Sequence, residues 1–387
     1  MAIQVLSFFT GAGLLDLGMH QAGFDVVWRN EYHIPFVKGF KHGFAKMHDA
    51  CIDDFPVCTS SIEDLTPYSI RQEAFSSKIW PDLFGVIGGP PCPDFSVAGT
   101  NKGSFGDNGK LTGLYFDQIV GLQPTFFIFE NVKGILSNLK HREYLTEQIH
   151  KVSKDYVFDI KIMNSLDVGV AQDRERVIVV AFHKSYLHDV INADDLKELE
   201  SRNRLLLSKL LHPNSYKKHN WFTWPTINKF ENAKSNFEWP TTNPFGAEEI
   251  TRPKNLPLEL CVGNYLENLE HLDNQNEFFT PKSDKFFLVE EGDVSRKSFK
   301  RLHRWRYSPT AAYGNNEVHL HPMLPRRISV REAMRIQTIP DNFSLPREMT
   351  LSNKFKTIGN GVPVKLANHI AQEIYRFFDC PTYALGN

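Results

Sequence analysis

The stretch that most constrains the fold lies near the start of the chain and reads Ile3-Gln4-Val5-Leu6-Ser7-Phe8-Phe9-Thr10-Gly11-Ala12-Gly13. It is an apolar run of strand length that ends in a glycine turn and opens a helix. Glycines after a strand let the backbone approach a ligand closely, and Phe9 adds an aromatic wall. The third glycine of the GxGxxG fingerprint is missing, so an ordinary strand-to-helix turn fits these residues as well as a cofactor site does.

The same alternation of apolar runs and helical stretches continues to residue 183. Further strands are expected at residues 25–28, 83–87, 126–129, 157–164 and 177–182, with helices such as 113–122 and 142–154 between them. Strands that alternate with helices predict an α/β fold with a doubly wound, mostly parallel sheet. Ligands bind beyond the carboxyl ends of the strands in such sheets, and polar or glycine-rich residues follow the first four strands here.

Length and composition are those of an ordinary globular protein. The chain has 387 residues and a formal net charge of −1, which favours two domains and argues against a uniformly basic surface, although not against a local basic face. No apolar run reaches the roughly 18 residues of a membrane span. The five cysteines include no CxxC pair, which argues against a disulfide framework or a zinc cluster. We therefore expect a reduced, cytoplasmic protein with no metal site and no membrane contact.

The rest of the chain divides into an irregular part and a regular tail. Prolines interrupt residues 184–318 often, and no long helical period survives there. Ser329 and Glu332 form a capping box for an expected helix over 329–336, and a helix with one apolar stripe is expected over 364–378. We predict a first domain at 1–183, a smaller irregular domain at 184–318, and a return segment at 319–387 that completes the first domain.

Charge is unevenly distributed in the irregular part. Residues 296–306 hold six basic and no acidic residues, with Phe299 and Trp305 between them. Such a run is either a solvated face or a surface that binds phosphates. Residues 248–293 hold eleven acidic against four basic residues, so a third interpretation is an ion-paired face turned towards this acidic segment.

The most unusual stretch reads Gly88-Gly89-Pro90-Pro91-Cys92-Pro93-Asp94-Phe95-Ser96. Its glycines and prolines predict a rigid turn after a buried strand, with Cys92 at the end of the turn. A buried cysteine is usually an inert small hydrophobic residue, whereas a cysteine framed by prolines at a sheet edge is placed as a nucleophile. The glycine-rich residues 99–113 that follow are expected to close as a lid.

Charged side chains follow other expected strands. Glu31 lies about 20 residues after the glycine turn, where an acid commonly binds ribose hydroxyls, although a surface glutamate fits too. Glu130 ends a fully apolar strand, where burial raises the pKa of a carboxyl group. Arg174 and Arg176 would share one face of an extended segment, or else pair at the surface with the neighbouring acids.

In this order, the motifs resemble the DNA (cytosine-5) methyltransferase family of the bacterial restriction–modification type, over about residues 1–182 and 319–375. The matching residues are Phe9-Thr10-Gly11-Ala12-Gly13, Pro91-Cys92, Glu130-Asn131-Val132, Gln172 with Arg174 and Arg176, Arg331-Glu332 with Gln337, and Gly359-Asn360 with Val362-Pro363. Several weak motifs that agree in order and spacing rarely do so by chance. The resemblance implies the S-adenosylmethionine-dependent methyltransferase fold and makes residues 184–318 a target-recognition domain.

The resemblance also implies S-adenosylmethionine as cofactor and S-adenosyl-L-homocysteine as product. The residues implied for the cofactor pocket are Phe9, Gly11, Gly13, Glu31, Ser61, Ile62, Asp64, Pro91, Leu114, Asn360 and Val362. The family usually has an aspartate where Ser61 stands, so either Ser61 or the nearby Asp64 is expected to bind the adenine. Pro93 and Ala171 replace the usual glutamine and proline of two motifs, and neither change removes a catalytic group.

The chemistry implied by the resemblance is methyl transfer to C5 of a cytosine flipped out of double-stranded DNA. Cys92 is implied as the nucleophile that adds to C6, Glu130 as the partner of the ring at N3, and Arg174 and Arg176 as supporting cations. The sequence does not name the base that removes the C5 proton. DNA contacts are expected from two groups of residues, Ser96, Asn101, Lys102 and Ser104 near the lid and Arg296, Lys300, Arg301, Arg304 and Arg306 in the basic run.

The expected partners are double-stranded DNA and a cognate restriction endonuclease that acts on the same site, with the chain itself a monomer. One alternative is a tRNA cytosine-5 methyltransferase, but that family carries Cys-Phe-Thr in its second domain where this chain has Trp221-Phe222-Thr223. Another alternative is a catalytically inactive DNA-binding regulator, against which the intact Cys92 and Glu130 argue. The recognition sequence cannot be deduced from the irregular domain.

Overall fold

The computed structural model describes residues 2–75, 80–91, 107–212, 220–248, 250–313 and 317–381. Its strands are β1 (Gln4–Phe8), β2 (Asp25–Asn30), β3 (Phe84–Gly88), β4 (Phe126–Val132), β5 (Tyr156–Asn164), β6 (Gln172–Asp173), β7 (Glu175–His183) and β8 (Ser308–Pro309). Its α-helices are α1 (Leu14–Gln21), α2 (Ile34–His48), α3 (Pro67–Ala74), α4 (Asp107–Leu122), α5 (Leu139–Val152), α6 (Lys184–Val190), α7 (Ala193–Lys209), α8 (Ala233–Asn236), α9 (Lys285–Leu288), α10 (Val330–Ile336), α11 (Leu351–Asn360) and α12 (Val364–Asp379).

The central sheet has six strands in the order β2-β1-β3-β4-β7-β5. β1 pairs in parallel with β2 and β3, and β3 pairs in parallel with β4, whereas β7 is antiparallel to both β4 and β5. This mostly parallel sheet confirms the predicted fold class. Because β2 lies on one side of β1 and β3 on the other, the strand order reverses between β1 and β3. The carboxyl ends of these two strands frame the crevice where such sheets bind ligands.

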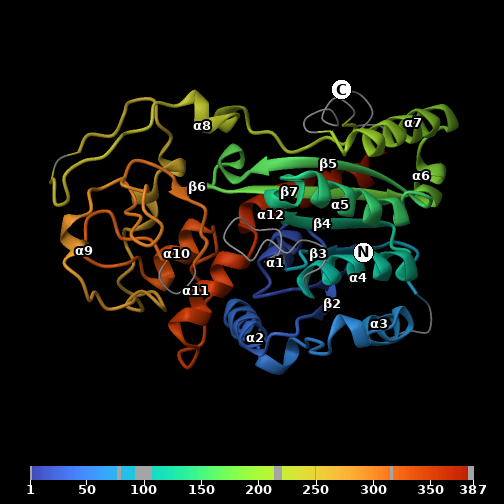
Figure 1. Cartoon of the computed structure of the whole chain (residues 1–387). Helices are drawn as coiled ribbons and strands as arrows, with labels where there is room; N and C mark the ends of the chain where they lie inside the picture. The colour runs from blue at the N-terminus through green and yellow to red at the C-terminus, as the bar shows by residue number, and fades with distance from the viewer. Residues whose placement is uncertain are drawn as a thin grey trace.

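Helices cover both faces of the sheet, as Figure 1 shows. Leu6 and Phe127 pack in one core with side chains of α3, α4 and α5. Their sequence neighbours Val5 and Phe126 point to the opposite face and pack in a second core with α1 and α12. The alternation follows from the two-residue period of a strand, and burial on both faces explains why the central strands are continuously apolar.

The last helix returns the chain to its beginning. α12 packs against α1, and the side-chain amide of Asn368 donates to the carbonyl oxygen of Gly18 at 3.3 Å. A Cβ atom at Gly18 would lie only 2.4 Å from the Cβ of Ala367 and 2.7 Å from the backbone nitrogen of Asn368. The two helices therefore meet at backbone distance, and this contact requires glycine.

The described residues between 184 and 224, on either side of the gap at 213–219, also pack on the sheet. Leu187, Leu199 and Trp221 belong to the same core as α12. The buried Asp159 of β5 accepts hydrogen bonds from the backbone N–H groups of Trp221 and Phe222, both at 2.7 Å. Burial raises the pKa of Asp159 to about 6. We therefore move the proposed start of the second domain from residue 184 to a point beyond residue 224.

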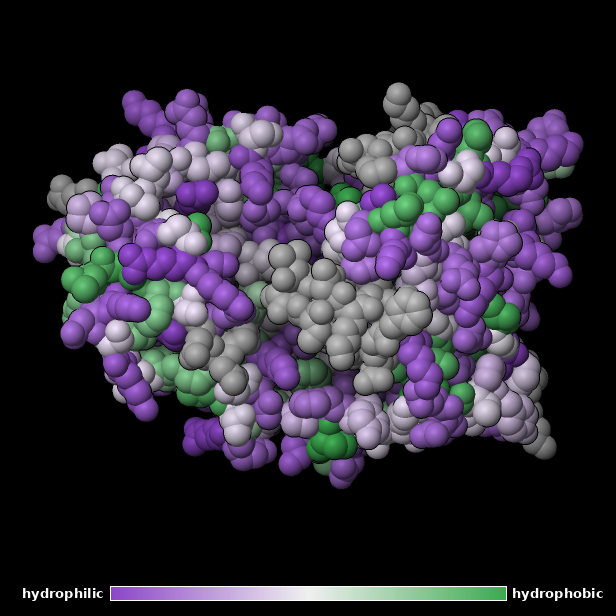
Figure 2. All heavy atoms as spheres, viewed as in Figure 1, coloured by the Kyte–Doolittle hydropathy of each residue, from purple (hydrophilic) through white to green (hydrophobic). Residues whose placement is uncertain are grey.

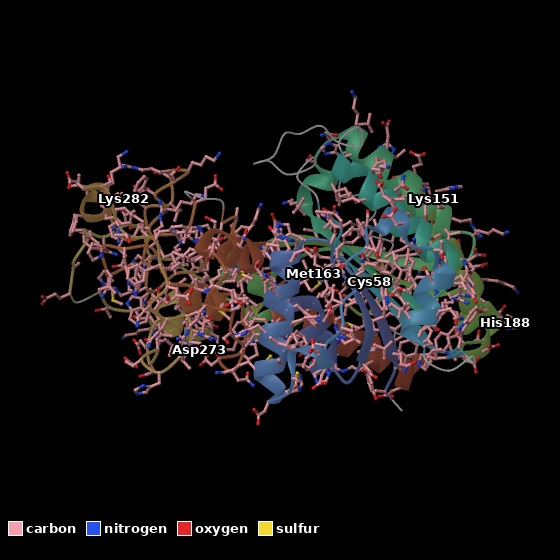
Figure 3. The ribbon with its side chains drawn as sticks, turned by 90° about the horizontal axis from the view of Figure 1, so that it is seen from below. Cys58, Lys151, Met163, His188, Asp273 and Lys282 are labelled. Atoms are coloured by element: carbon pink, nitrogen blue, oxygen red, sulfur yellow. The ribbon has the colours of Figure 1, made fainter. Side chains whose placement is uncertain are left out.

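The described residues between 225 and 327 contain little regular structure. Their strands and α-helices are the four-residue helices α8 and α9 and the two-residue strand β8. β8 pairs with β6, so this second lobe joins the first close to the start of β7. Figure 3 shows Cys58 and Met163, near the carboxyl ends of β2 and β5, in the middle of the molecule, with Asp273 and Lys282 in the second lobe. The ligand-binding edge of the sheet thus faces the second lobe.

The surface in Figure 2 is mainly hydrophilic, with apolar side chains in small patches. No helix in the described part of the chain is both long and apolar enough to cross a membrane. The same described residues contain no group of three or more His, Cys, Asp or Glu side chains arranged to hold a metal ion.

The close contact between α1 and α12 can be tested with Gly18→Ala. The added methyl group meets the backbone of α12, so we expect the free energy of unfolding to fall by about 1–3 kcal/mol, the usual cost of overpacking. His20→Ala, on the exposed side of the same helix, is the control and should change it by less than about 0.5 kcal/mol. Equal urea midpoints for the two variants would show that the helices separate without cost.

Candidate active site

The glycine turn after β1 leaves open space at the crevice. Phe9, Gly11 and Gly13 have positive φ angles of 54°, 60° and 78°. This conformation is strained for phenylalanine and free for glycine. A Cβ atom at Gly11 would meet no heavy atom within 4 Å, whereas one at Gly13 would lie 2.6 Å from the rings of Phe40 and Phe44. Gly11 therefore leaves room for a ligand, and Gly13 is required because α2 packs against it.

Glu31 binds the backbone of this turn. Its Oε2 accepts a hydrogen bond from the N–H of Gly11 at 2.9 Å, and its Oε1 accepts one from the N–H of His33 at 2.7 Å. Burial raises the pKa of Glu31, and the two amides act in the opposite direction. The structure thus places Glu31 beside Gly11, as a shared ligand site requires. Tyr32, which the sequence did not single out, follows Glu31 and is 71% exposed.

A buried ion pair supports the glycine turn from inside the fold. Asp16 of α1 is fully buried, accepts a hydrogen bond from the Ser7 hydroxyl at 2.6 Å, and pairs with Arg29, with 3.3 Å between Oδ2 and Nε. The Thr10 hydroxyl donates to Ser7 Oγ at 2.9 Å. The Arg29 guanidinium lies 5.1 Å from the centre of the Phe40 ring. These contacts join β1, α1 and β2. In the sequence, the acid near the start of the helix after the glycine turn, Asp16, is the signal that could have indicated this buried ion pair.

The expected adenine contact stays divided between Ser61 and Asp64. The side-chain amide of Asn30 donates to the carbonyl oxygen of Ser60 at 2.9 Å, which brings this segment to the end of β2. Ser61 caps a single 3-10 turn over Ile62–Asp64. Ile62 is buried in the core and Asp64 is exposed. Both candidates therefore lie at the edge of the crevice, and the choice between them stays a prediction.

The turn after α11 lies beside the glycine turn. A Cβ atom at Gly361 would lie 2.3 Å from Cδ1 of Leu14, the first residue of α1. The Asn360 side chain is exposed, and Val362 is buried in the core that contains α12. The structure therefore brings residues 360–362 to the same crevice as Gly11, about 350 residues away in the sequence.

The turn after β3 is held by two residues whose roles the sequence did not reveal. The side-chain amide of Asn131 donates to the carbonyl oxygen of Pro90 at 3.3 Å. Tyr115 of α4 donates its hydroxyl to the carbonyl oxygen of Ile128 at 2.7 Å, and its ring fills the place of a side chain at Gly88. Two further expected cofactor residues lie nearby in sequence, the exposed Pro91 and the half-buried Leu114. Five expected site residues lie outside the described residues: Cys92, Ser96, Asn101, Lys102 and Ser104.

Glu130 forms a nearly buried ion pair at the carboxyl end of β4. Its Oε1 lies 2.8 Å from Nε of Arg176, and both side chains are about nine-tenths buried. Burial raises the pKa of Glu130, while Arg176 and Arg174 act in the opposite direction. A Cβ atom at Gly89 would lie 2.6 Å from the second oxygen, Oε2. One carboxyl oxygen is thus held by Arg176, and the other faces the turn that leads to Cys92.

The side chain of Arg174 has different hydrogen-bond partners from that of Arg176. Its side chain is fully buried, and Nη2 donates to the carbonyl oxygens of Gly359 at 2.8 Å and Gly361 at 2.9 Å. The expectation that both arginines support the target base is therefore corrected for Arg174. Its donors are directed at main-chain carbonyls of the turn after α11.

The basic run at residues 296–306 is also corrected in part. Arg301 is fully buried, and its guanidinium donates to the carbonyl oxygens of four residues: Phe286, Val289, His321 and Leu324. Arg304 pairs with the fully buried Glu291, with 2.9 Å between Nη2 and Oε2. Glu291 belongs to the acidic segment 248–293, so the ion-paired alternative applies to Arg304. Neither arginine is available to phosphates.

The rest of the basic run is accessible. Arg296 is exposed, and Lys300 and Arg306 are partly exposed. DNA contact by these three residues stays a prediction. The number of charges in the sequence could not distinguish these three residues from Arg301 and Arg304. The groups that bind Arg301 and Arg304 come from segments more than ten residues away in the sequence.

Comparison with known proteins assigns the chain to a family of enzymes. The family model for C-5 cytosine-specific DNA methylases matches residues 3–376. The chain is 42% identical to the Type II methyltransferase M.NmeDI of Neisseria meningitidis serogroup C over 97% of its own length and 84% of the relative's. It is 30% identical to the Type II methyltransferase M.FnuDI of Fusobacterium nucleatum, over 96% and 94% of the two chains.

A solved structure of a protein described as a DNA modification methyltransferase encoded within a prophage of E. coli has the same fold. It superimposes with a TM-score of 0.63 at 22% identity and covers 98% of this chain and 100% of that chain. This likeness shows that the two proteins share a fold. The chain belongs to the C-5 cytosine-specific DNA methylase family and is a DNA (cytosine-5) methyltransferase.

The contact between Gly89 and Glu130 can be tested with Gly89→Ala. The new methyl group would overlap Oε2 of a carboxyl group that Arg176 holds in place, so Glu130 must move. Because small displacements of reacting groups cost up to about 100-fold in rate, we expect kcat for methyl transfer to fall about 10- to 100-fold. The melting temperature and cofactor affinity, measured on the same variant, should stay close to those of the parent. An unchanged kcat would mean that Oε2 has no role at this position.

The ion pair of Arg304 is tested with Arg304→Ala. Removal of the arginine leaves the buried Glu291 charge without its partner, so the free energy of unfolding should fall by about 3–5 kcal/mol. The slope of log DNA affinity against log salt should not change in the folded variant. Arg306→Ala is the control for an accessible cation of the same run. If the slope falls by about 0.9 in Arg304→Ala and the free energy of unfolding is unchanged, Arg304 contacts a phosphate and the ion-paired interpretation is wrong.

Proposed function

We propose that the chain transfers a methyl group from S-adenosylmethionine to C5 of a cytosine flipped out of double-stranded DNA, through a covalent bond between Cys92 and C6. The observation that carries this proposal is the position of Glu130. Its carboxyl group is paired with Arg176 on one side and faces Gly89, three residues before Cys92, on the other. A buried acid beside Gly89 supports the proposal, because the proposed nucleophile follows Gly89 by three residues in the sequence.

The residues at the crevice fit S-adenosylmethionine. Gly11 leaves space where the strand order reverses, which is the usual position of a nucleotide cofactor. Glu31 is a carboxylate beside that space, suited to ribose hydroxyls. The partly exposed Phe9 offers apolar surface and the exposed Asn360 offers an amide, while Val362 next to Asn360 is buried in the core. When bound, the cofactor supplies a methyl group on a positively charged sulfur, which an activated C5 can accept.

Activation of C5 is the task of the protein's own side chains. Cytosine C5 is a weak nucleophile, and addition of the Cys92 thiolate to C6 gives C5 the electron density that it needs. A free cysteine has a pKa of about 8.5, so the site must favour the thiolate. Glu130, whose pKa burial raises, donates a proton in a hydrogen bond to N3 as the C6–S bond forms. Arg176 holds Glu130 and stabilises negative charge that develops at O2.

The last steps restore the aromatic ring. After the methyl group has bonded to C5, a base removes the C5 proton, the electron pair re-forms the C5–C6 double bond, and the C6–S bond breaks to return the Cys92 thiolate. N3 gives its proton back to Glu130, which restores the neutral base and the acid. These atoms are not accessible inside a duplex, so the target base must leave the stack. Residues Asn101, Lys102 or Ser104 of the glycine-rich lid are proposed to fill the vacated space.

We further propose that the enzyme acts as a monomer and protects a DNA sequence from a cognate restriction endonuclease. The relatives in Neisseria and Fusobacterium carry the names of Type II methyltransferases, the class that accompanies such endonucleases. Residues Arg296, Lys300 and Arg306 are the proposed phosphate contacts of the second lobe.

The covalent step is tested with Cys92→Ser and DNA that contains 5-fluorocytosine. Fluorine at C5 prevents removal of the C5 substituent as a proton, so the parent enzyme should form a stable adduct visible on a denaturing gel. Cys92→Ser should form none while it retains its affinity for S-adenosyl-L-homocysteine. Transfer of labelled methyl groups to tRNA and not to DNA, or an adduct that persists in Cys92→Ser, would contradict the proposal.

A further inference from the structure

The end of α11 presents carbonyl oxygens to the protein interior. The last carbonyl groups of a helix have no partner within the helix, and burial makes an unpaired one costly. Here four successive carbonyls, at residues 358–361, receive hydrogen bonds from two buried side chains. Gln337 Nε2 donates to Ile358 at 2.8 Å. Arg174 Nη2 donates to Gly359 and Gly361, with a longer contact of 3.5 Å to Asn360.

This turn has little freedom to move in other directions. A Cβ atom at Gly359 would lie 2.9 Å from the carbonyl oxygen of Ala311, and one at Gly361 would meet the side chain of Leu14. The N–H of Val364, at the start of α12, donates to the carbonyl oxygen of Gln337 at 3.2 Å. The turn is thus packed between α1 and the segment around residue 311, and its polar groups depend on Gln337 and Arg174.

Arg174 reaches this turn from the strand segment that also carries Arg176. Only one residue separates the two arginines, yet their side chains serve different places. Arg176 holds Glu130 at the proposed base site, and Arg174 holds the carbonyls next to Asn360 and Val362 at the proposed cofactor site. The segment therefore joins the two halves of the active site through two adjacent contacts.

We propose that Arg174 is a positioning residue for the cofactor, which acts by capping α11 and fixing the turn at 359–362, and that it does not touch the target base. This inference rests on the proposed function of the crevice as the cofactor site. A cation at the carboxyl end of a helix is favoured by the helix dipole, so the charge itself contributes.

The geometry requires an arginine. The guanidinium group presents several N–H donors in one plane, and here Nη2 serves the carbonyls of the turn while Nη1 lies 3.5 Å from the carbonyl oxygen of Ala311. A lysine keeps the charge but concentrates it on a single nitrogen, which cannot reach both the carbonyls of the turn and the carbonyl of Ala311. Arg174→Lys therefore separates loss of position from loss of charge.

The experiment compares Arg174→Lys with Arg331→Lys. Arg331 is also fully buried and also donates to main-chain carbonyls, but to those of Asp273, Pro340 and Phe343 and to none in the turn at 359–362. The readouts are the Kd for S-adenosyl-L-homocysteine by calorimetry without DNA, the Kd for substrate DNA, the KM for the cofactor, and the melting temperature.

We expect Arg174→Lys to weaken S-adenosyl-L-homocysteine binding and raise the cofactor KM about tenfold or more, with DNA affinity within about twofold of the parent. Arg331→Lys should lower the melting temperature by a similar amount and leave cofactor affinity within about twofold. If cofactor affinity is unchanged in Arg174→Lys while DNA binding weakens or less covalent adduct forms, Arg174 acts at the target base and the proposal is overturned. Equal losses of cofactor affinity in both variants would also overturn it, because the effect would then be general instability.

A second variant applies if Arg174→Lys does not fold. Gln337→Asn withdraws the donor from the Ile358 carbonyl and loosens the same turn from its other side. Selective loss of S-adenosyl-L-homocysteine affinity in this variant supports the proposal, and unchanged affinity overturns it. Failure of the parent enzyme to bind S-adenosyl-L-homocysteine at all would instead refute the proposed function, so the two failures are distinguishable.

Discussion

The antiparallel direction of β7 is the constraint on which the active site depends. Arg176 is the second residue of β7, and it lies opposite Val132 at the carboxyl end of β4 because the two strands run in opposite directions. In a parallel arrangement, the first residues of β7 would lie at the other edge of the sheet, about 20 Å away for strands of this length. The reversal thus brings the start of one strand to the end of another and lets Arg176 hold Glu130 beside the turn after β3.

Buried arginines hold together the parts of the molecule that lack regular structure. Among the described residues, Arg174, Arg301 and Arg331 are the three largest fully buried side chains, and each donates to several carbonyl oxygens. Irregular chain leaves carbonyls without the partners that a helix or sheet would provide, and a guanidinium group supplies up to five donors in one plane. This explains how a lobe with only short helices keeps a defined shape, and why basic residues in such a lobe are not all available to DNA.

Local sequence signals were sufficient for the sheet and for much of the crevice. The six strands of the central sheet follow from apolar runs that end in glycine or polar residues, and the capping box at Ser329 and Glu332 forms as predicted. Gly11 and Glu31 were found because the end of one strand and the end of the next meet at a parallel edge, and they are hydrogen-bonded there. Such features depend on a few neighbouring residues and on general rules of strand connection, so a single sequence reveals them.

The partners of the charged side chains were decided by the folded chain alone. Arg174 and Arg176 look equivalent in the sequence, but one caps a helix about 185 residues further on and the other pairs with Glu130. Arg301 and Arg304 belong to a basic run that is typical of DNA binding, but Arg301 donates to carbonyl groups and Arg304 pairs with Glu291. Likewise, Trp221 belongs to the core of the first lobe although its neighbourhood in the sequence is irregular. Periodicity records which residues face inward, whereas the choice of a partner depends on which distant segments the packing brings within about 3 Å, and no local pattern contains that information.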